Sequence, residues 1–187
     1  MNEYAVPLLR GLLGQDFAAL APAVRRVHDL TSRLQLTGRA EAEIFLGLLG
    51  RLVCRVMGFP RHGADQPVSV TFTPTGDGGE EWQRDFAGRQ YRSVFSRGEG
   101  SDAEYLIEQM GAITAVFALA VAGDRLRFEI IRCRCLGIPM PWILSPRCVA
   151  YESEQDGDFR FDIALELPVF GRLIAYRGVL GQGASND

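Results

Sequence analysis

The chain contains no lysine, so every one of its 20 basic residues is an arginine. This absence excludes Schiff-base chemistry on a lysine and the phosphate-binding lysine of a P-loop. An anion site in this protein must therefore use arginine, histidine or backbone N–H groups. The net charge of −3 gives no electrostatic footprint for nucleic acid, so we expect no nucleic-acid partner.

Cysteine and histidine are also scarce: the chain has four cysteines and two histidines. The cysteines, Cys54, Cys133, Cys135 and Cys148, form no C-x-x-C pair, and two histidines are too few for a usual zinc site. We therefore expect free buried thiols, no metal and no cofactor.

Long apolar runs are missing too. No stretch approaches the roughly 20 apolar residues that a membrane helix needs, and the first residues lack the pattern of a signal peptide. We expect a cytoplasmic protein. The hydrophobic content of 47% and the charged content of 23% are typical of a globular chain. Residues 1–180 are expected to form a single domain, followed by a disordered tail over residues 181–187.

Helical patterns dominate the first third of the chain. Apolar spacing predicts short helices over Ala5–Leu13 and from Pro22 to His28, then a strand over Leu34–Gly38. The longest helical segment is Glu41–Met57, whose broad apolar stripe includes Leu48 and Leu52 and favours packing on a sheet.

From Pro67 onward the patterns are those of strands with short turns. The segment 137–146 contains three prolines, which excludes a strand interior and indicates a rigid apolar crossing. The predicted fold class is α+β, with a large curved antiparallel sheet of about eight strands around or against one long helix. The sheet is either open, as in a helix-grip fold, or closed like a barrel.

The dipeptide Ala87-Gly88 predicts a tight hairpin turn. In that register one face collects Trp82, Arg84, Phe86, Tyr91 and Phe95, and we predict that this face points inward. Arg84 is then a cation among aromatic rings, where an unpaired charge is costly.

Two interpretations of Arg84 follow. The more common arrangement is a structural pair with an internal carboxylate, for which Glu104, Glu108 and Glu152 are the candidates. The alternative is an anionic ligand bound by the guanidinium.

A second hairpin allows two registers. A two-residue turn at Asp156-Gly157 places Glu152 opposite Phe161 and makes Glu152 an internal carboxylate. A three-residue turn that starts at Gln155 instead places Tyr151 opposite Phe161 and leaves Glu152 outside. We favour the three-residue turn because it buries an apolar set.

Sequence motifs for catalysis are missing. The patterns of serine hydrolases, zinc proteases, dinucleotide-binding loops and P-loops do not occur. His28 lies between a helix and a strand, either at a pocket rim or at a helix end, where it would interact with the helix dipole. Trp142 either covers a pocket or fills the core, and we favour the core.

Several stretches are similar to those of a known family. They include Glu81–Gly88 with its Trp-x-Arg-x-Phe pattern, Leu136–Pro146 with Gly-x-Pro-x-Pro, and shorter matches around His28, Phe161 and Tyr176. The chain resembles a bacterial domain of unknown function that occurs alone or joined to the C-terminus of NAD(P)-binding proteins similar to saccharopine or short-chain dehydrogenases. The resemblance covers Leu8 to Leu180.

The resemblance implies a domain that works beside a dehydrogenase-like partner. His28, Trp82, Arg84 and Tyr176 match the family's motifs, and with Tyr91 and Trp142 they are the candidate ligand-binding residues. The leading hypothesis is a domain that binds a small apolar or amphipathic molecule with an acidic head. Alternatives are a protein-interaction module, as monomer or homodimer, and a metal-independent enzyme that uses His28 as acid or base.

Overall fold

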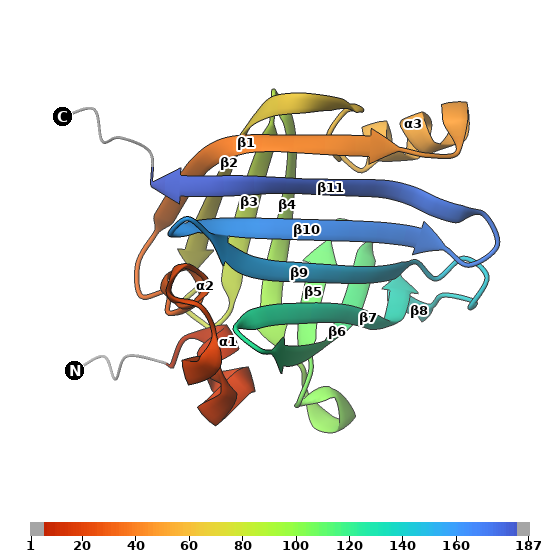
Figure 1. Ribbon diagram of the computed structural model, residues 1–187. Helices are drawn as coiled ribbons and strands as arrows, with labels where there is room; N and C mark the ends of the chain where they lie inside the picture. The colour runs from red at the N-terminus through yellow and green to blue at the C-terminus, as the bar shows by residue number, and fades with distance from the viewer. Residues whose placement is uncertain (1–5, 183–187) are drawn as a thin grey trace.

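Residues 6–182 are described by the computed structural model, which consists of short helices and a single antiparallel sheet (Figure 1). Ten strands form a closed ring, because β6 pairs with β7 as well as with β5. The two-residue strand β8 pairs only with β7, outside this ring.

The helical elements are α1 (Leu8–Leu13), η1 (Gly14–Ala19), α2 (Pro22–His28), α3 (Gly47–Val56) and η2 (Gly100–Asp102). The strands are β1 (Leu34–Ile44), β2 (Gly63–Pro74), β3 (Glu80–Phe86), β4 (Arg89–Arg97), β5 (Leu106–Met110), β6 (Ile113–Ala122), β7 (Arg125–Cys135), β8 (Ile138–Pro139), β9 (Arg147–Gln155), β10 (Asp158–Leu167) and β11 (Gly171–Gln182).

This architecture shows that the predicted α+β fold class is wrong. The chain is mostly β, with 55% strand and 18% helix, and the sheet closes on itself instead of wrapping a long helix. Side chains from the strands point into the interior and form the core. Closure uses both edges of β7, which pairs with β6 on one side and β9 on the other. Residues 6–182 form 11 strands, so the prediction of about eight was also too low.

The predicted helix over Glu41–Met57 is in fact two elements. Glu41–Ile44 is the end of β1, which pairs with β11 as far as Ile44 opposite Ile174. Leu46 then adopts a left-handed conformation (φ 61°), and α3 begins at Gly47. Acidic and apolar residues alternate over Glu41–Ile44 with the period of a strand, and pairing with β11 outweighs the helical pattern.

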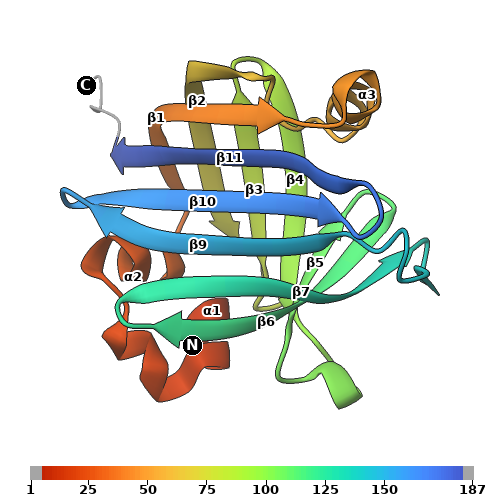
Figure 2. The same cartoon turned by 45° about the vertical axis from the view of Figure 1, so that its right-hand side comes forward.

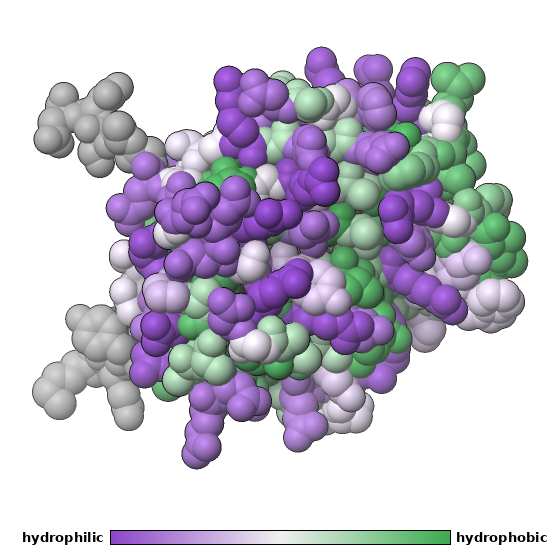
Figure 3. Space-filling model, in the orientation of Figure 1, coloured by the Kyte–Doolittle hydropathy of each residue, from purple (hydrophilic) through white to green (hydrophobic). Residues whose placement is uncertain are grey.

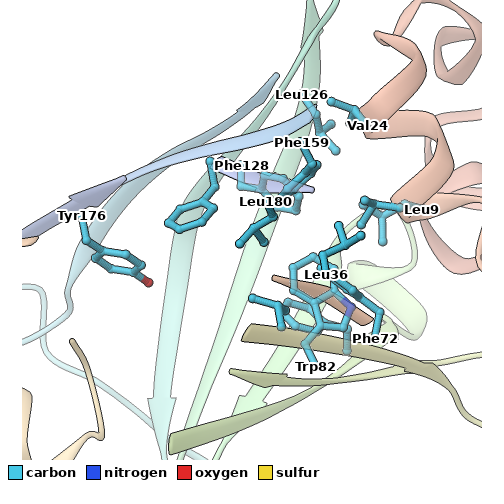
Figure 4. Packing of buried hydrophobic residues seen from close by; sticks show 14 of the residues in the cluster. Leu9, Val24, Leu36, Phe72, Trp82, Leu126, Phe128, Phe159, Tyr176 and Leu180 are labelled. Carbon is cyan, nitrogen blue, oxygen red and sulfur yellow. The ribbon is translucent and has the colours of Figure 1, made fainter. Parts of the chain in front are cut away.

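The two ends of the barrel differ. The N-terminal helices close one end, and α3 lies outside the barrel at the other (Figures 1 and 2). Leu9 and Val24 are fully buried; Val24 lies beside Leu126 and Leu9 beside Leu36 of the barrel (Figure 4). No helix within residues 6–182 is long and apolar enough to cross a membrane.

The first hairpin has the predicted register. Phe86 lies opposite Arg89, and Arg84 lies opposite Tyr91. Trp82, Phe86, Tyr91 and Phe95 are all buried, which confirms the predicted inward face of the hairpin. Ala87 and Gly88 both have positive φ, at 51° and 85°, as a type I′ turn requires.

The second hairpin has the register that we did not favour. Glu152 lies opposite Phe161 across a two-residue turn at Asp156 and Gly157. Both turn residues have positive φ, so this is again a type I′ turn, whose twist matches that of the strands. Phe161 and Glu152 are buried inside the barrel, and Tyr151 lies outside, where Arg125 stacks on its ring at 4.6 Å. Turn geometry therefore outweighed the apolar pattern.

Two other segments also differ from expectation. Residues 137–146 do not form the predicted crossing: Ile138–Pro139 form β8 at the edge of β7, and the turn that follows is exposed. Gly181 and Gln182, predicted to begin the tail, are the last residues of β11, where Gln182 pairs with Leu36. The remainder of the predicted tail, 183–187, lies outside the described residues.

Candidate functional site

The barrel contains an apolar cavity of about 260 Å³. It begins at the end that carries α3, where Val53, Met57, Met140 and Leu144 line it, and extends inward as far as Trp82. Its volume is close to the lower limit of about 300 Å³ for small-molecule pockets, so it fits a small molecule. Most of its wall is aliphatic or aromatic, and five polar side chains interrupt that wall: Arg84, Tyr91, Glu108, Glu152 and Tyr176.

Arg84 is the cation of this cavity. Its guanidinium carbon lies 5.0 Å from the ring centroids of both Trp82 and Tyr91, and Nη1 donates a hydrogen bond to Oγ of Ser93 at 3.1 Å. Protein atoms enclose the side chain, and the surface that it keeps faces the cavity. The aromatic rings stabilise the positive charge, but they do not accept conventional hydrogen bonds from the remaining N–H groups of the guanidinium.

No carboxylate pairs directly with Arg84 in the part of the chain that the structure describes. Glu108 and Glu152 line the same cavity and act on Arg84 only at longer range. Burial would lower the pKa of Arg84, but its electrostatic interactions with Tyr91, Glu108 and further polar neighbours outweigh that effect and raise it above its usual value. Arg84 is therefore a permanent cation with unused donors.

Tyr91 and Tyr176 form the second polar feature. Their hydroxyl oxygens lie 3.1 Å apart on facing sides of the barrel. Burial raises the pKa of both phenols, and the neighbouring phenol raises that of Tyr176 further. Both hydroxyls therefore remain protonated, and each can donate one hydrogen bond and accept another.

His28 and Glu152 form a buried pair behind the cavity wall. Nε2 of His28 lies 2.5 Å from Oε2 of Glu152, and the imidazole stacks on Trp82 with a centroid distance of 5.6 Å. Burial would lower the pKa of His28, but the charge and hydrogen bond of Glu152, with a smaller effect of Glu80, raise it. His28 itself is fully buried and does not line the cavity.

Glu80 extends this buried network. Its Oε2 accepts a hydrogen bond from Nε1 of Trp82 at 2.9 Å, while Oε1 has no partner in the described part of the chain. Burial raises the pKa of Glu80, although the charge of His28 and the bond from Trp82 oppose this shift. The network holds the Trp82 indole in place as the inner wall of the cavity.

The cavity offers no activated nucleophile or metal set. All four cysteines are free, as predicted, and three of them are buried. Cys133 and Cys148 line the cavity; burial, together with Glu108, raises the pKa of Cys148 to about 12, and burial also raises that of Cys133. Both thiols are therefore protonated at neutral pH. Within residues 6–182 no group of three or more potential ligands is placed to hold a metal ion.

The structure thus brings most of the predicted site residues together. Trp82, Arg84, Tyr91 and Tyr176 all line the cavity. His28 lies one layer behind it, and Trp142 is neither buried nor part of the wall, with 71% of its surface exposed. The prediction that Trp142 fills the core was therefore wrong.

Three acidic residues of the site, Glu80, Glu108 and Glu152, were not among the predicted site residues, although Glu108 and Glu152 were considered as partners of Arg84. The two-residue turn at Asp156-Gly157, left open by the sequence, already placed Glu152 inside the barrel. Glu80 has the same strand parity as Trp82 and Arg84, and this parity alone would have placed it inside.

Comparison with curated proteins and with solved structures gave no match. A family model does match, and it covers residues 20–180, which include every strand except the last two residues of β11. The family match does not show that the domain works beside a dehydrogenase-like protein, so this partner stays a prediction. Because the model covers most of the chain, this protein belongs to the family described as Domain of unknown function (DUF4166).

Proposed function

We propose that the barrel binds a small amphipathic molecule, with an anionic head on Arg84 and an apolar part in the cavity. The observation that carries this proposal is a half-buried arginine, enclosed by aromatic rings on the wall of an apolar cavity, with one side-chain hydrogen bond and no carboxylate partner among residues 6–182. An enclosed cation of this kind is costly unless another group supplies the opposite charge. A ligand head group would supply it.

The charges around the cavity narrow the class of head group. Glu108 and Glu152 lie on the same wall as Arg84, so a doubly charged head such as a phosphate monoester would be repelled by both. A single carboxylate pairs with Arg84 at a smaller cost, and the hydroxyls of Tyr91 and Tyr176 can add hydrogen bonds. We therefore propose a monoanionic amphiphile such as a medium-chain carboxylic acid.

The cavity supports this class better than it supports catalysis. An acid or base must reach the proton that it transfers, directly or through one water. His28, the candidate acid or base, is fully buried behind the wall, and the cavity thiols are protonated. The polar groups on the wall therefore suit binding and orientation.

The first experiment is native mass spectrometry of the purified protein before and after denaturing extraction. A bound mass that extraction releases identifies the natural ligand directly. Calorimetry on stripped protein then compares decanoate, decan-1-ol and decyl phosphate. We expect decanoate to bind most tightly of the three, because only decanoate matches both the charge and the apolar wall.

The Arg84→Met variant tests the role of the cation. It should bind decanoate about ten- to a hundredfold more weakly, since a hydrogen bond to a charged group contributes about 1.5–3 kcal/mol. Binding of decan-1-ol should be unchanged. Arg92→Met, on the outer face of β4, is the matched control and should leave both affinities intact. Equal affinity of wild type and Arg84→Met for decanoate would contradict the proposal.

A further inference from the structure

The open end of the barrel carries an apolar rim, which we define as the exposed apolar side chains of three segments. These are α3, the stretch 136–144 around β8, and the turn between β10 and β11 (Figures 1 and 2). Green side chains gather along this side of the surface (Figure 3). The side chains of the apolar rim are Leu48, Leu49, Leu52, Val56, Leu136, Ile138, Trp142, Ile143, Leu144, Val169 and Phe170.

This clustering is not a random scatter of surface residues. Fourteen large hydrophobic side chains are exposed among residues 6–182, and eleven of them belong to the apolar rim. Leu48 is 83% exposed and Phe170 is 50% exposed. A contiguous apolar surface that a protein keeps in contact with water marks an interaction site.

The helix α3 shows how the rim is built. Gly50, Val53, Cys54 and Met57 form its inner face, on which Gly50 and Cys54 are buried and Val53 and Met57 line the cavity. Leu48, Leu52 and Val56, four residues apart, form a separate row that faces solvent. The helix therefore has more apolar surface than the barrel covers.

Two of the three rim segments carry charges of one sign only, and the third, the turn between β10 and β11, is bordered by Glu166, which pairs with Arg172 at 3.5 Å. The segments 45–62 and 133–147 contain no aspartate or glutamate, although the whole chain has a net charge of −3. Their exposed arginines include Arg51, Arg55, Arg61 and Arg147, and none of these has a side-chain partner in the part of the chain that the structure describes. The rim is thus a positively charged, apolar patch on an acidic protein.

We propose that the apolar rim docks on an anionic lipid bilayer. Aliphatic side chains and a tryptophan suit the boundary between lipid headgroups and acyl chains, and arginines attract anionic headgroups. Arg51 and Arg55 form the row of α3 next to Leu48, Leu52 and Val56, which is the arrangement of an interfacial amphipathic helix. A protein partner would need acidic groups for four arginines as well as a surface that fits three separate segments, so the charge and shape of the rim favour a bilayer.

This proposal stands on the rim and does not depend on the ligand in the cavity. Docking would place the mouth of the cavity against the lipid, where amphipathic molecules partition; that consequence alone rests on the proposed function. Vesicle binding is therefore measured on the full chain without added decanoate. A failure to bind vesicles would leave the binding of decanoate untouched, and the reverse also holds.

Sedimentation with vesicles tests the proposal. We expect the protein to bind vesicles of phosphatidylcholine and phosphatidylglycerol, to bind pure phosphatidylcholine much more weakly, and to dissociate in high salt. The fluorescence of exposed Trp142 should shift to shorter wavelength and be quenched by brominated acyl chains. Trp82 is buried and should contribute little to either change.

Two variants separate the apolar contribution from the charged one. Leu48→Ser with Leu52→Ser should weaken binding about a hundredfold or more, because two large apolar side chains no longer enter the lipid. The matched control is Val94→Ser with Ile131→Ser, two exposed hydrophobic residues outside the rim, which should bind like wild type. Leu48→Ser with Leu52→Ser should keep the wild-type melting temperature, since both side chains are mostly exposed. Val94 and Ile131 are only 37% and 38% exposed and lie in strands, so the control should lose up to about 1 kcal/mol of stability at each position while it binds vesicles like wild type.

Arg51→Gln with Arg55→Gln should weaken binding to anionic vesicles about 25-fold, at about fivefold for each arginine. Arg33→Gln with Arg92→Gln changes the net charge equally outside the rim and is the control. The proposal is overturned if anionic vesicles fail to bind the protein, or if the rim variants bind as wild type does. It is also overturned if sedimentation equilibrium shows a dimer that Leu48→Ser with Leu52→Ser dissociates, because a second copy then covers the rim.

Discussion

Replacing Glu152 by glutamine should destabilise the protein by about 3 kcal/mol near pH 6, because it removes the anion from a fully buried histidine pair. The two side chains contact each other at 2.5 Å, and His28 has no exposed surface. We expect a value at the lower limit of the range for broken buried pairs, since His28 can release its proton. At roughly 2–4 °C per kcal/mol for a chain of this length, the melting temperature should fall by about 6–12 °C.

The destabilisation should depend on pH in a defined direction. The pKa of His28 is raised above its ordinary value of 6.5, because Glu152 and, to a smaller extent, Glu80 outweigh the effect of burial. Folding therefore favours the protonated imidazole. The stabilisation is fully present below the unfolded pKa and is lost as the pH rises through the folded pKa. The difference between wild type and Glu152→Gln should shrink from pH 6 to pH 9.

Urea unfolding at several pH values measures this difference. A double-mutant cycle with His28→Gln and Glu152→Gln isolates the pair and should give a coupling energy of about 2 kcal/mol. Glu166→Gln removes an exposed carboxylate, paired with Arg172, and should change stability by less than about 0.5 kcal/mol. A difference that stays constant or grows toward pH 9 would refute the reasoning, as would a coupling energy near zero.

Two further predictions test the packing of the barrel. Gly38→Ala should cost about 3 kcal/mol in urea unfolding, because a Cβ there would lie 1.9 Å from the carbonyl oxygen of Val179 in β11. Gly76→Ala, where a Cβ meets no atom within 4 Å, should be neutral, and equal losses at both positions would contradict the tight β1–β11 contact. In alkylation followed by mass spectrometry near pH 8, Cys148 should stay unmodified because burial raises its pKa to about 12, while the less buried Cys135 reacts first. Modification of both at the same rate would show that the cavity wall opens readily.

The local parts of the fold were predictable from residue patterns. The alternation from Trp82 to Phe95, together with the turn at Ala87-Gly88, predicted which side chains point inward, and four of the six candidate site residues line the cavity. This succeeded because strand parity and a two-residue turn are properties of neighbouring residues. The helix over Glu41–Met57 failed because its first residues fit both a helix and a strand, and pairing with β11 decided between them.

The sequence by itself determined the chemistry that a binding site can use: no lysine, few histidines, and an arginine among aromatic rings at the inner face of a hairpin. Only the tertiary structure decided that the sheet closes through β6 and β7, that α3 lies outside, and that Glu152 meets His28 across 124 residues. The physical reason is that strand alternation specifies which face a side chain occupies but not which strand lies beside it. Pairing partners depend on the free energy of the whole barrel, so closure, the cavity and its apolar rim exist only in three dimensions.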